Sequence, residues 1–477
     1  MDNKEKLLKT ATQFDVHKWS DYPEVTNVVK AIFGEIFALR SSKDIRIRNA
    51  GMVERSLRVV LIDLWAANTL SLNPYRAISK NKSDYQKDSR YRQIFLKYDY
   101  LIPVINDLCE LGYLEEKLGY RFIGHSRRTR IKATDKLINK ILTPEYGFGE
   151  LIDNQGALSI LKAANNSETI ILKDANGDLV EYRDTNSTTL MRENVSKFND
   201  KLSKTKITLR ISDEQHKALQ ERISNEYSDR LTIDFTSINL HRVFNNSSWK
   251  EGGRFYGGWW QNIPKELRKH IEINRKETVE VDYSGHHIRI LYAKKGLLPP
   301  DDPYDLEGFG RDIQKQTLLI MINAETRTSA IRAIVKDVIR PPFPIMEELE
   351  KRHAEIKEYF FTGAGLWLMY EDSILTERIM LLMLERGAAV LPVHDSFIVR
   401  TSYEEELQEV MEIAFEEIYG KKASLKTKKT VLLEESERKE SLREAGKKIE
   451  DFITTDLTEL LSKTSNNYKW FINMWGS

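Results

Sequence analysis

Residues 281–289 are Val-Asp-Tyr-Ser-Gly-His-His-Ile-Arg, and residues 391–399 are Leu-Pro-Val-His-Asp-Ser-Phe-Ile-Val. Each stretch places an aspartate, Asp282 or Asp395, at the end of an apolar, β-rich run. We therefore expect each carboxylate to lie at the tip of a strand and to point into a cleft. Two such carboxylates can hold two Mg²⁺ ions about 3.5–4 Å apart, an arrangement that promotes phosphoryl transfer. The pair predicts a two-metal site, provided that the two strands are neighbours.

The composition is that of a soluble globular protein, with 477 residues, 41% hydrophobic and 30% charged. This length suits two or three domains. The net charge of +1 means that any attraction for nucleic acid must come from local basic patches. The single cysteine, Cys109, excludes a disulfide framework and a cysteine-based zinc site and favours a reducing compartment. We expect no signal peptide and no membrane-spanning stretch, and hence a cytoplasmic protein.

The N-terminal part of the chain, up to residue 142, predicts helices followed by a basic hairpin. The expected elements are helices within 24–70 and at 101–111, strands at 113–117 and 128–134, and a closing helix at 135–142. Their order resembles a winged helix-turn-helix. Residues 117–141 carry eight Lys and Arg against one acid, as a wing that grips DNA phosphates would. The candidate contacts are Arg127, Arg128, Arg130 and Lys132; the alternative is an ordinary solvated hairpin.

The chain divides into four expected regions. They are the N-terminal module at 1–142, a linker and hairpin region at 143–205, a catalytic module at 206–430 and a helical tail at 431–477. Asn176-Gly177 is a favoured two-residue turn and predicts the hairpin. Helical patterns at 187–203 and 212–226 follow it.

Five motifs follow one another in the catalytic module. They are Gly253-Arg254 with Gln261-Asn262-Ile263-Pro264, the Asp282 stretch, a helix from Arg311 to Asn323, an amphipathic helix at about 368–386 and the His394-Asp395 hairpin. In order and spacing they resemble the family A DNA polymerases and the single-subunit phage-type RNA polymerases. The resemblance covers about a third of the chain, roughly 250–400. It implies an α+β fold with an antiparallel palm sheet, reduced fingers and a helical thumb.

The resemblance also implies roles for individual residues. Asp282 and Asp395 would be catalytic and, with Tyr283, would hold two Mg²⁺ ions, with Mn²⁺ as a substitute. The incoming nucleoside triphosphate would meet Arg311, Lys315, Leu319, Asn323 and His287. The DNA template-primer, or an RNA equivalent, would meet Arg254, Gln261, Arg289 and His394. Arg311 and Lys315 are four residues apart and so share one helical face, as a pair of phosphate ligands requires.

Simpler interpretations exist for the same residues. The aspartates can be turn residues, Arg311 and Lys315 an exposed basic face, and His394 a side chain that only fixes its turn.

Three positions depart from the DNA polymerase pattern. His287 stands where these enzymes carry the glutamate that blocks a ribose 2′-hydroxyl, Asn323 replaces a tyrosine, and Ser396 replaces a glutamate, as in the RNA polymerase branch. We expect relaxed sugar selection. The two aspartates are only 113 residues apart, so we also expect short fingers and low processivity.

The leading functional hypothesis is a compact template-directed DNA polymerase that serves replication or priming of a mobile element. One alternative is a single-subunit RNA polymerase or primase. Another is a catalytically inactive DNA-binding initiator or defence protein that keeps the polymerase fold.

Overall fold

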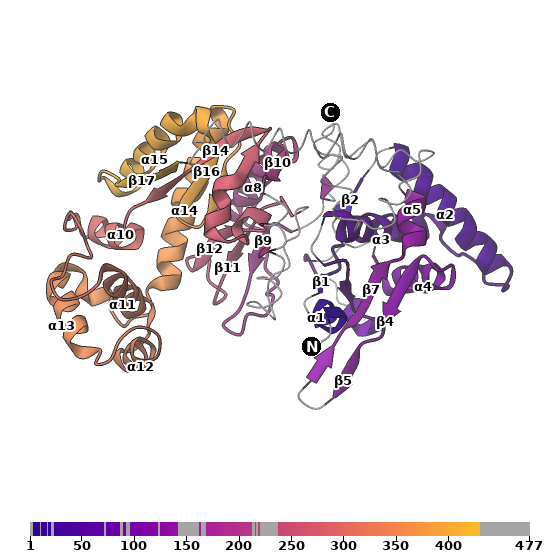
Figure 1. Ribbon diagram of the computed structural model, residues 1–477, viewed down its shortest axis with the longest axis horizontal. Helices are drawn as coiled ribbons and strands as arrows, with labels where there is room; N and C mark the ends of the chain where they lie inside the picture. Colours follow the sequence, from indigo (N-terminus) through magenta and orange to yellow (C-terminus); the bar gives the residue numbers. More distant parts are fainter. Residues whose placement is uncertain are drawn as a thin grey trace, which may run out of the picture.

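The computed structural model describes residues 3–429 except 10, 17, 21–22, 71–72, 86–88, 92–95, 123–124, 142–161, 164–167, 212–214, 216–217 and 220–236. Helices and several sheets build two hydrophobic cores, one from Phe14 to Ile141 and one from Ile170 to Tyr419. The fold is therefore mixed, consistent with the expected α+β class. Figure 1 shows the two halves side by side. None of the described helices has the length and apolar character needed to cross a bilayer.

The first half contains α1 to α5 and the short strands between them. The bounds are α1 Asn3–Lys9, β1 Thr12–Gln13, β2 Lys18–Trp19, α2 Pro23–Ser41, α3 Ala50–Leu70, β3 Arg76–Ile78, α4 Tyr98–Glu110, β4 Leu114–Lys117, β5 Tyr120–Phe122, β6 His125–Arg127, β7 Thr129–Ala133 and α5 Asp135–Ile141. One sheet has the strand order β1-β3-β7-β4. The β5–β6 hairpin lies between β4 and β7 in the chain and projects from this half in Figure 1. The expected order of helix, strand, loop, basic strand and helix is confirmed, with β5 and β6 formed inside the expected loop, and the helical pattern at 24–70 forms two helices.

The second half contains the longer sheets. The bounds are β8 Lys162–Ala163, β9 Ile170–Leu172, α8 Asn186–Ser203, β10 Ile207–Leu209, β11 His241–Phe244, β12 Gly252–Tyr256, β13 Ile271–Ile273, β14 Lys276–Tyr283, α10 His286–Lys294, α11 Arg311–Asn323, α12 Arg327–Asp337, α13 Phe343–Arg352, α14 Gly365–Glu385, β15 Leu391–Val393, β16 Ser396–Arg400, α15 Glu404–Tyr419 and β17 Leu425–Lys429. Strand β8 pairs with β2 of the first half.

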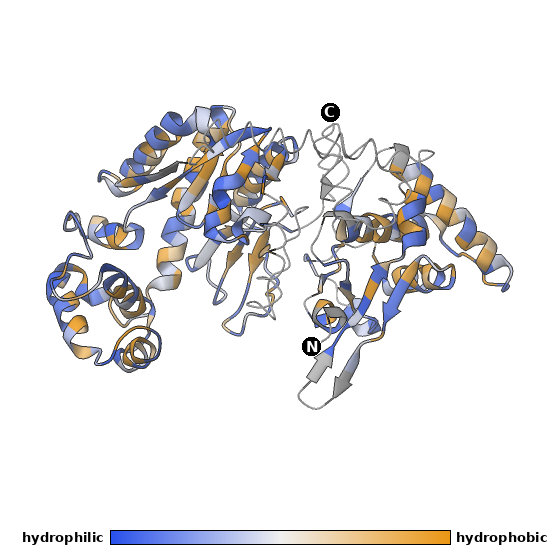
Figure 2. Ribbon diagram, viewed as in Figure 1, coloured by the Kyte–Doolittle hydropathy of each residue, from blue (hydrophilic) through white to orange (hydrophobic). Residues whose placement is uncertain are grey.

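The largest sheet has the order β10-β13-β14-β16-β15, with β17 paired to β14. All its pairings are antiparallel. Helix α14 packs against α15, α8 and β12, and α15 contacts β14 and β16. Hydrophobic and hydrophilic residues alternate along α15 in Figure 2, as expected of a helix with one face on a core. Helices α11, α12 and α13 form a group to one side of the sheet (Figure 1).

The region expected as a linker differs from its prediction. Strand β9 pairs in parallel with β11, and its expected hairpin partner joins it through a bridge between Lys173 and Leu179 and a hydrogen bond from the Val180 amide to the Leu172 carbonyl at 2.9 Å. Helix α8 buries Val195, Phe198 and Leu202 in the second core. The part of 143–205 that is described from Ile170 onward therefore packs with the second half. The tail at 431–477 and most of the pattern at 212–226 lie outside the described residues.

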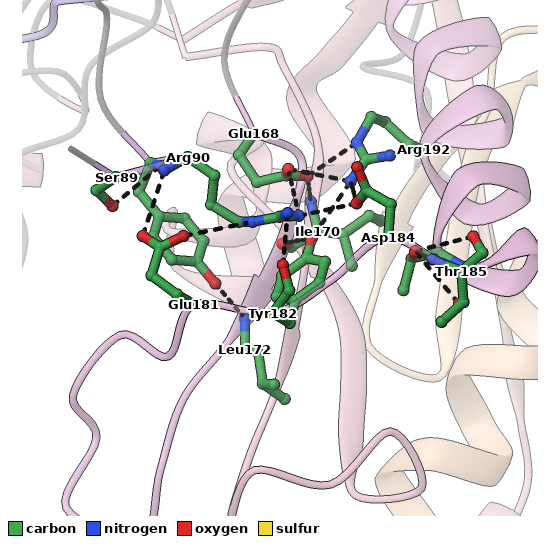
Figure 3. Close-up of polar contacts among 12 residues, drawn as sticks. Ser89, Arg90, Glu168, Ile170, Leu172, Glu181, Tyr182, Asp184, Thr185 and Arg192 are labelled. Carbon is green, nitrogen blue, oxygen red and sulfur yellow. Dashed lines mark hydrogen bonds and ion pairs between the residues drawn. The ribbon is translucent and has the colours of Figure 1, made fainter.

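A charged joint connects the segment around Arg90 to the second half (Figure 3). The guanidinium of Arg90 lies 3.5 Å from the ring centre of Tyr182 and donates to the Tyr182 carbonyl at 2.7 Å. It also forms ion pairs with Glu168 at 3.3 Å and Asp184 at 3.0 Å. Arg192 binds the same two carboxylates, so each acid is shared between two arginines.

Candidate functional site

The two aspartates lie at one end of neighbouring strands. Asp282 of β14 is directly opposite Ser396 of β16, and Asp395 is the residue that precedes Ser396. The backbone amide of Tyr283 donates to the carbonyl of Asp395 at 3.3 Å. Both aspartates are half-buried. The two strands are thus neighbours, which was the condition for a shared metal site.

Asp282 has a second neighbour of opposite charge. On its other side β14 pairs with β17, and Asp282 is opposite Lys426. Directly opposite residues of an antiparallel pair project from the same face. Ser396 and the exposed Lys426 therefore flank Asp282 on one face of the sheet, and Ser396 donates to Glu280 at 2.9 Å.

A tight turn holds Asp395. Strands β15 and β16 pair at Val393 and Ser396, so His394 and Asp395 are the two turn residues. His394 has a φ of 58°, a left-handed conformation that non-glycine residues seldom adopt. Such strained residues persist where the surrounding structure fixes them, and they gather at functional sites. The His394 side chain is exposed beside the aspartate.

Behind the aspartates, Asp372 of α14 links two of the motifs. Its carboxylate accepts from Arg254 at 2.6 Å and from Nε2 of His286 at 3.1 Å. Asp372 is 2% exposed. Burial alone would raise the pKa of Asp372, but the hydrogen bond from His286 and the charge of Arg254 outweigh it and lower that pKa. Asp372 is therefore a buried anion that joins the Gly-Arg motif to the helix after Asp282.

Arg254 also contacts His287. Its Nη2 lies 3.1 Å from Nε2 of His287. Because a guanidinium can only donate, Nε2 must accept and carries no proton. Burial lowers the pKa of His287 to about 4, with His286 and Arg254 adding to the effect and Asp372 and Asp395 opposing it. His287 is thus neutral near neutral pH and is committed to Arg254.

The helix that was predicted to bind phosphates, α11, follows the loop that contains Asp302 and Tyr304. Arg311, its first residue, forms an ion pair with Asp302 at 3.1 Å and lies 5.0 Å from the ring centre of Tyr304. Lys315 is exposed one turn further along α11. Arg289 donates to the carbonyl of Ser284 at 2.8 Å and so supports the turn after Asp282.

Four residues that were predicted to contact metal, nucleotide or DNA have side chains held within the protein. The Tyr283 hydroxyl donates to the Met411 carbonyl at 2.6 Å, so its phenol belongs to the core. The amide of Gln261 donates to the carbonyls of Phe255 and Pro392, at 2.9 and 3.0 Å, instead of projecting toward a duplex.

Asn323 and Leu319 form a local pair at the end of α11. The amide of Asn323 donates to the carbonyl of Leu319 at 2.7 Å, and its oxygen packs against Gly365. Leu319 is half-buried. These contacts stabilise the junction of α11 and α14, where the resemblance implied contacts with a nucleotide.

The basic residues of the first half have different environments. Arg128 is exposed, and Arg127 is half-buried with an ion pair to Glu5 at 3.3 Å. Lys132 pairs with Glu115 at 3.4 Å. Arg130 is 8% exposed and donates to the carbonyl of Leu8 at 2.7 Å, so it anchors α1 and does not present its charge to a ligand.

The sequence interpretation missed Asp372, Tyr304 and Lys426. Asp372 had a usable signal, because Glu371-Asp372-Ser373 interrupts the apolar positions Leu368 and Leu375 of an otherwise amphipathic helix. Tyr304 lies in a polar loop and Lys426 in a basic run, and neither had a local signal.

No family model and no curated protein matches this chain. In the part of the chain that the structure describes, no group of three or more His, Cys, Asp or Glu is arranged to hold a metal.

Proposed function

We propose that this protein is a template-directed nucleotidyltransferase that extends a nucleic acid strand with nucleoside triphosphates. The observation that carries the proposal is the β14–β16 register, which brings Asp282 and Asp395 to one end of adjacent strands. In this proposal the sheet serves as a polymerase palm and the group α11, α12 and α13 as short fingers.

The donor set fits Mg²⁺. Mg²⁺ is a hard ion that usually binds through one or two carboxylates and completes its shell with substrate phosphates and water. The half-buried pair Asp282 and Asp395 supplies two such carboxylates, and the triphosphate would supply the other oxygens. Bound metal ions would neutralise charge on the attacking and leaving oxygens, and Mn²⁺ would substitute for Mg²⁺.

The surrounding side chains support the same chemistry. Arg311 and Lys315 offer a fork and a point charge to the triphosphate from one helix. Arg254, held by Asp372, and the exposed His394 would contact the primer-template. In the first half, a winged-helix-like module would bind DNA phosphates through Arg128 and the β5–β6 hairpin.

An extension panel tests the proposal. It combines primed and unprimed DNA and RNA templates with Mg²⁺ and either dNTPs or rNTPs. Asp282→Asn and Asp395→Asn should each lower incorporation by at least about 100-fold, because each removes a charge that the metals require, while affinity for DNA stays unchanged. Asp337→Asn, an exposed carboxylate on α12, is the control and should retain full activity.

A single-subunit RNA polymerase or primase is the second candidate. His287 and Asn323 are both bonded to neighbouring protein groups, so neither offers the sugar-excluding side chain of a DNA polymerase. Initiation on unprimed template with rNTPs would favour this candidate. DNA binding without incorporation on any template would instead favour an inactive initiator or defence protein. Extension of primed DNA fits replication or priming of a mobile element.

A further inference from the structure

Tyr304 lies between the two parts of the proposed active site. It belongs to the loop that joins α10 to α11, and it is 6% exposed. Arg311 lies over its ring at 5.0 Å. The Tyr304 hydroxyl is 4.0 Å from the point where a β-carbon on Gly285 would stand. The phenol therefore spans from the proposed phosphate-binding helix to the turn that follows Asp282.

Burial and the nearby charges keep the phenol of Tyr304 protonated. Burial raises the pKa of Tyr304 to about 12; Arg311 and Arg289 oppose this effect, and Asp302 and Asp395 add to it. The hydroxyl is thus protonated near neutral pH and can donate a hydrogen bond. Its neighbours are the residues to which metal and triphosphate binding were assigned.

The loop around Tyr304 is fixed by hydrogen bonds. Oδ1 of Asp302 accepts from the backbone amide of Tyr304 at 2.9 Å and forms an ion pair with Arg311 at 3.1 Å. The Pro303 carbonyl lies 3.0 Å from Nε2 of His353, and Arg289 donates to the Asp301 carbonyl at 3.4 Å. A loop held from several sides gives the phenol a defined position.

The hydrogen bonds that fix the loop do not involve the Tyr304 hydroxyl. Among the described residues the hydroxyl has no hydrogen-bond partner, and its oxygen is not fully buried. A buried tyrosine ring normally finds a partner for its hydroxyl. Here the ring is packed while the hydroxyl lacks a partner among the described residues, as expected of a group that binds a ligand.

We propose that Tyr304 is a substrate-contacting residue, whose hydroxyl hydrogen-bonds the incoming nucleoside triphosphate between Arg311 and the turn that follows Asp282. This inference rests on the proposed nucleotidyltransferase function. It assigns to a loop residue a contact that His287 and Asn323 do not make, since both are bonded within the protein.

Tyr304→Phe isolates the hydroxyl, because it keeps the ring that packs against Arg311. The KM for nucleoside triphosphate should rise roughly 3- to 10-fold, the value of one hydrogen bond, with kcat changed less than about twofold and primer-template affinity unchanged. Tyr403→Phe, in the turn that follows β16, is the matched control and should leave the KM unchanged. Equal melting temperatures for the two variants exclude a folding effect.

Two arms of the assay identify the atoms that are contacted. If Tyr304→Phe raises the KM equally for dNTPs and rNTPs, the hydroxyl contacts the triphosphate. If the KM rises for only one set, the hydroxyl contacts the sugar. Binding of dATP with Mg²⁺, measured by calorimetry, tests without turnover whether the hydroxyl contacts the nucleotide. An unchanged KM and an unchanged dATP affinity would overturn the inference, whereas absence of incorporation by the unaltered protein counts against the proposed function alone.

Discussion

At the scale of single residues, His287 should make the protein sensitive to acid. Its pKa falls from an ordinary 6.5 to about 4 on folding, through burial and the nearby charges. Between these values the unfolded chain binds a proton that the folded chain does not, so stability is lost as the pH falls. From about pH 7 to about pH 5 this group should remove about 1–2 kcal/mol. Urea unfolding at both values should show a smaller pH effect in His287→Gln, and equal pH effects would contradict the assignment.

The same scale shows what a sequence can and cannot predict about a site. Asp282 and Asp395 were predictable because a β-rich run that ends in an acid is a local pattern. Gln261 was not, because its amide bonds the carbonyl of Pro392, a residue 131 positions away. Whether Arg130 faces solvent or binds the Leu8 carbonyl was equally a tertiary outcome. Residue types follow from local pattern, but hydrogen-bond partners follow from the fold.

At the scale of elements, α11 lies where it was predicted. Its observed bounds, Arg311 and Asn323, are those predicted from the sequence. Strand β9 shows the limit, because the favoured Asn176-Gly177 turn formed while the strand paired in parallel with β11, more than 60 residues later. Sheet pairing depends on nonlocal contacts that the turn does not encode.

Helix α11 should depend on a glycine of α14 for its position. A β-carbon on Gly365 would stand 1.7 Å from the side-chain oxygen of Asn323, so Gly365→Ala must displace that amide from its bond to Leu319. We expect a loss of about 1–3 kcal/mol in the free energy of unfolding. Gly34→Ala, on α2 with no atom within 4 Å, should instead stabilise by about 0.5–1 kcal/mol. Urea denaturation compares the two, and shifts of the same sign would refute the packing argument.

At the scale of the whole molecule, two modules were predictable from the change between a basic helix-hairpin region and the motif-bearing region. The predicted boundary at residue 206 was wrong, because the amphipathic pattern of α8 does not indicate which core its apolar face joins. The structure assigns Val195 and Phe198 to the second core. The contacts of Arg90 with residues 168–184 add a joint to which no local sequence pattern pointed.

This joint should contribute to holding the two halves together. Arg90 is 18% exposed and binds Glu168 and Asp184, so Arg90→Ala leaves two carboxylates to Arg192 alone. Loss of hydrogen bonds to charged groups should cost about 2 kcal/mol in the free energy of unfolding. Small-angle X-ray scattering should also record a larger radius of gyration. Arg183→Ala removes an exposed arginine nearby and should change neither the free energy of unfolding nor the radius of gyration. If Arg90→Ala also left both unchanged, the joint would have no role in holding the halves together.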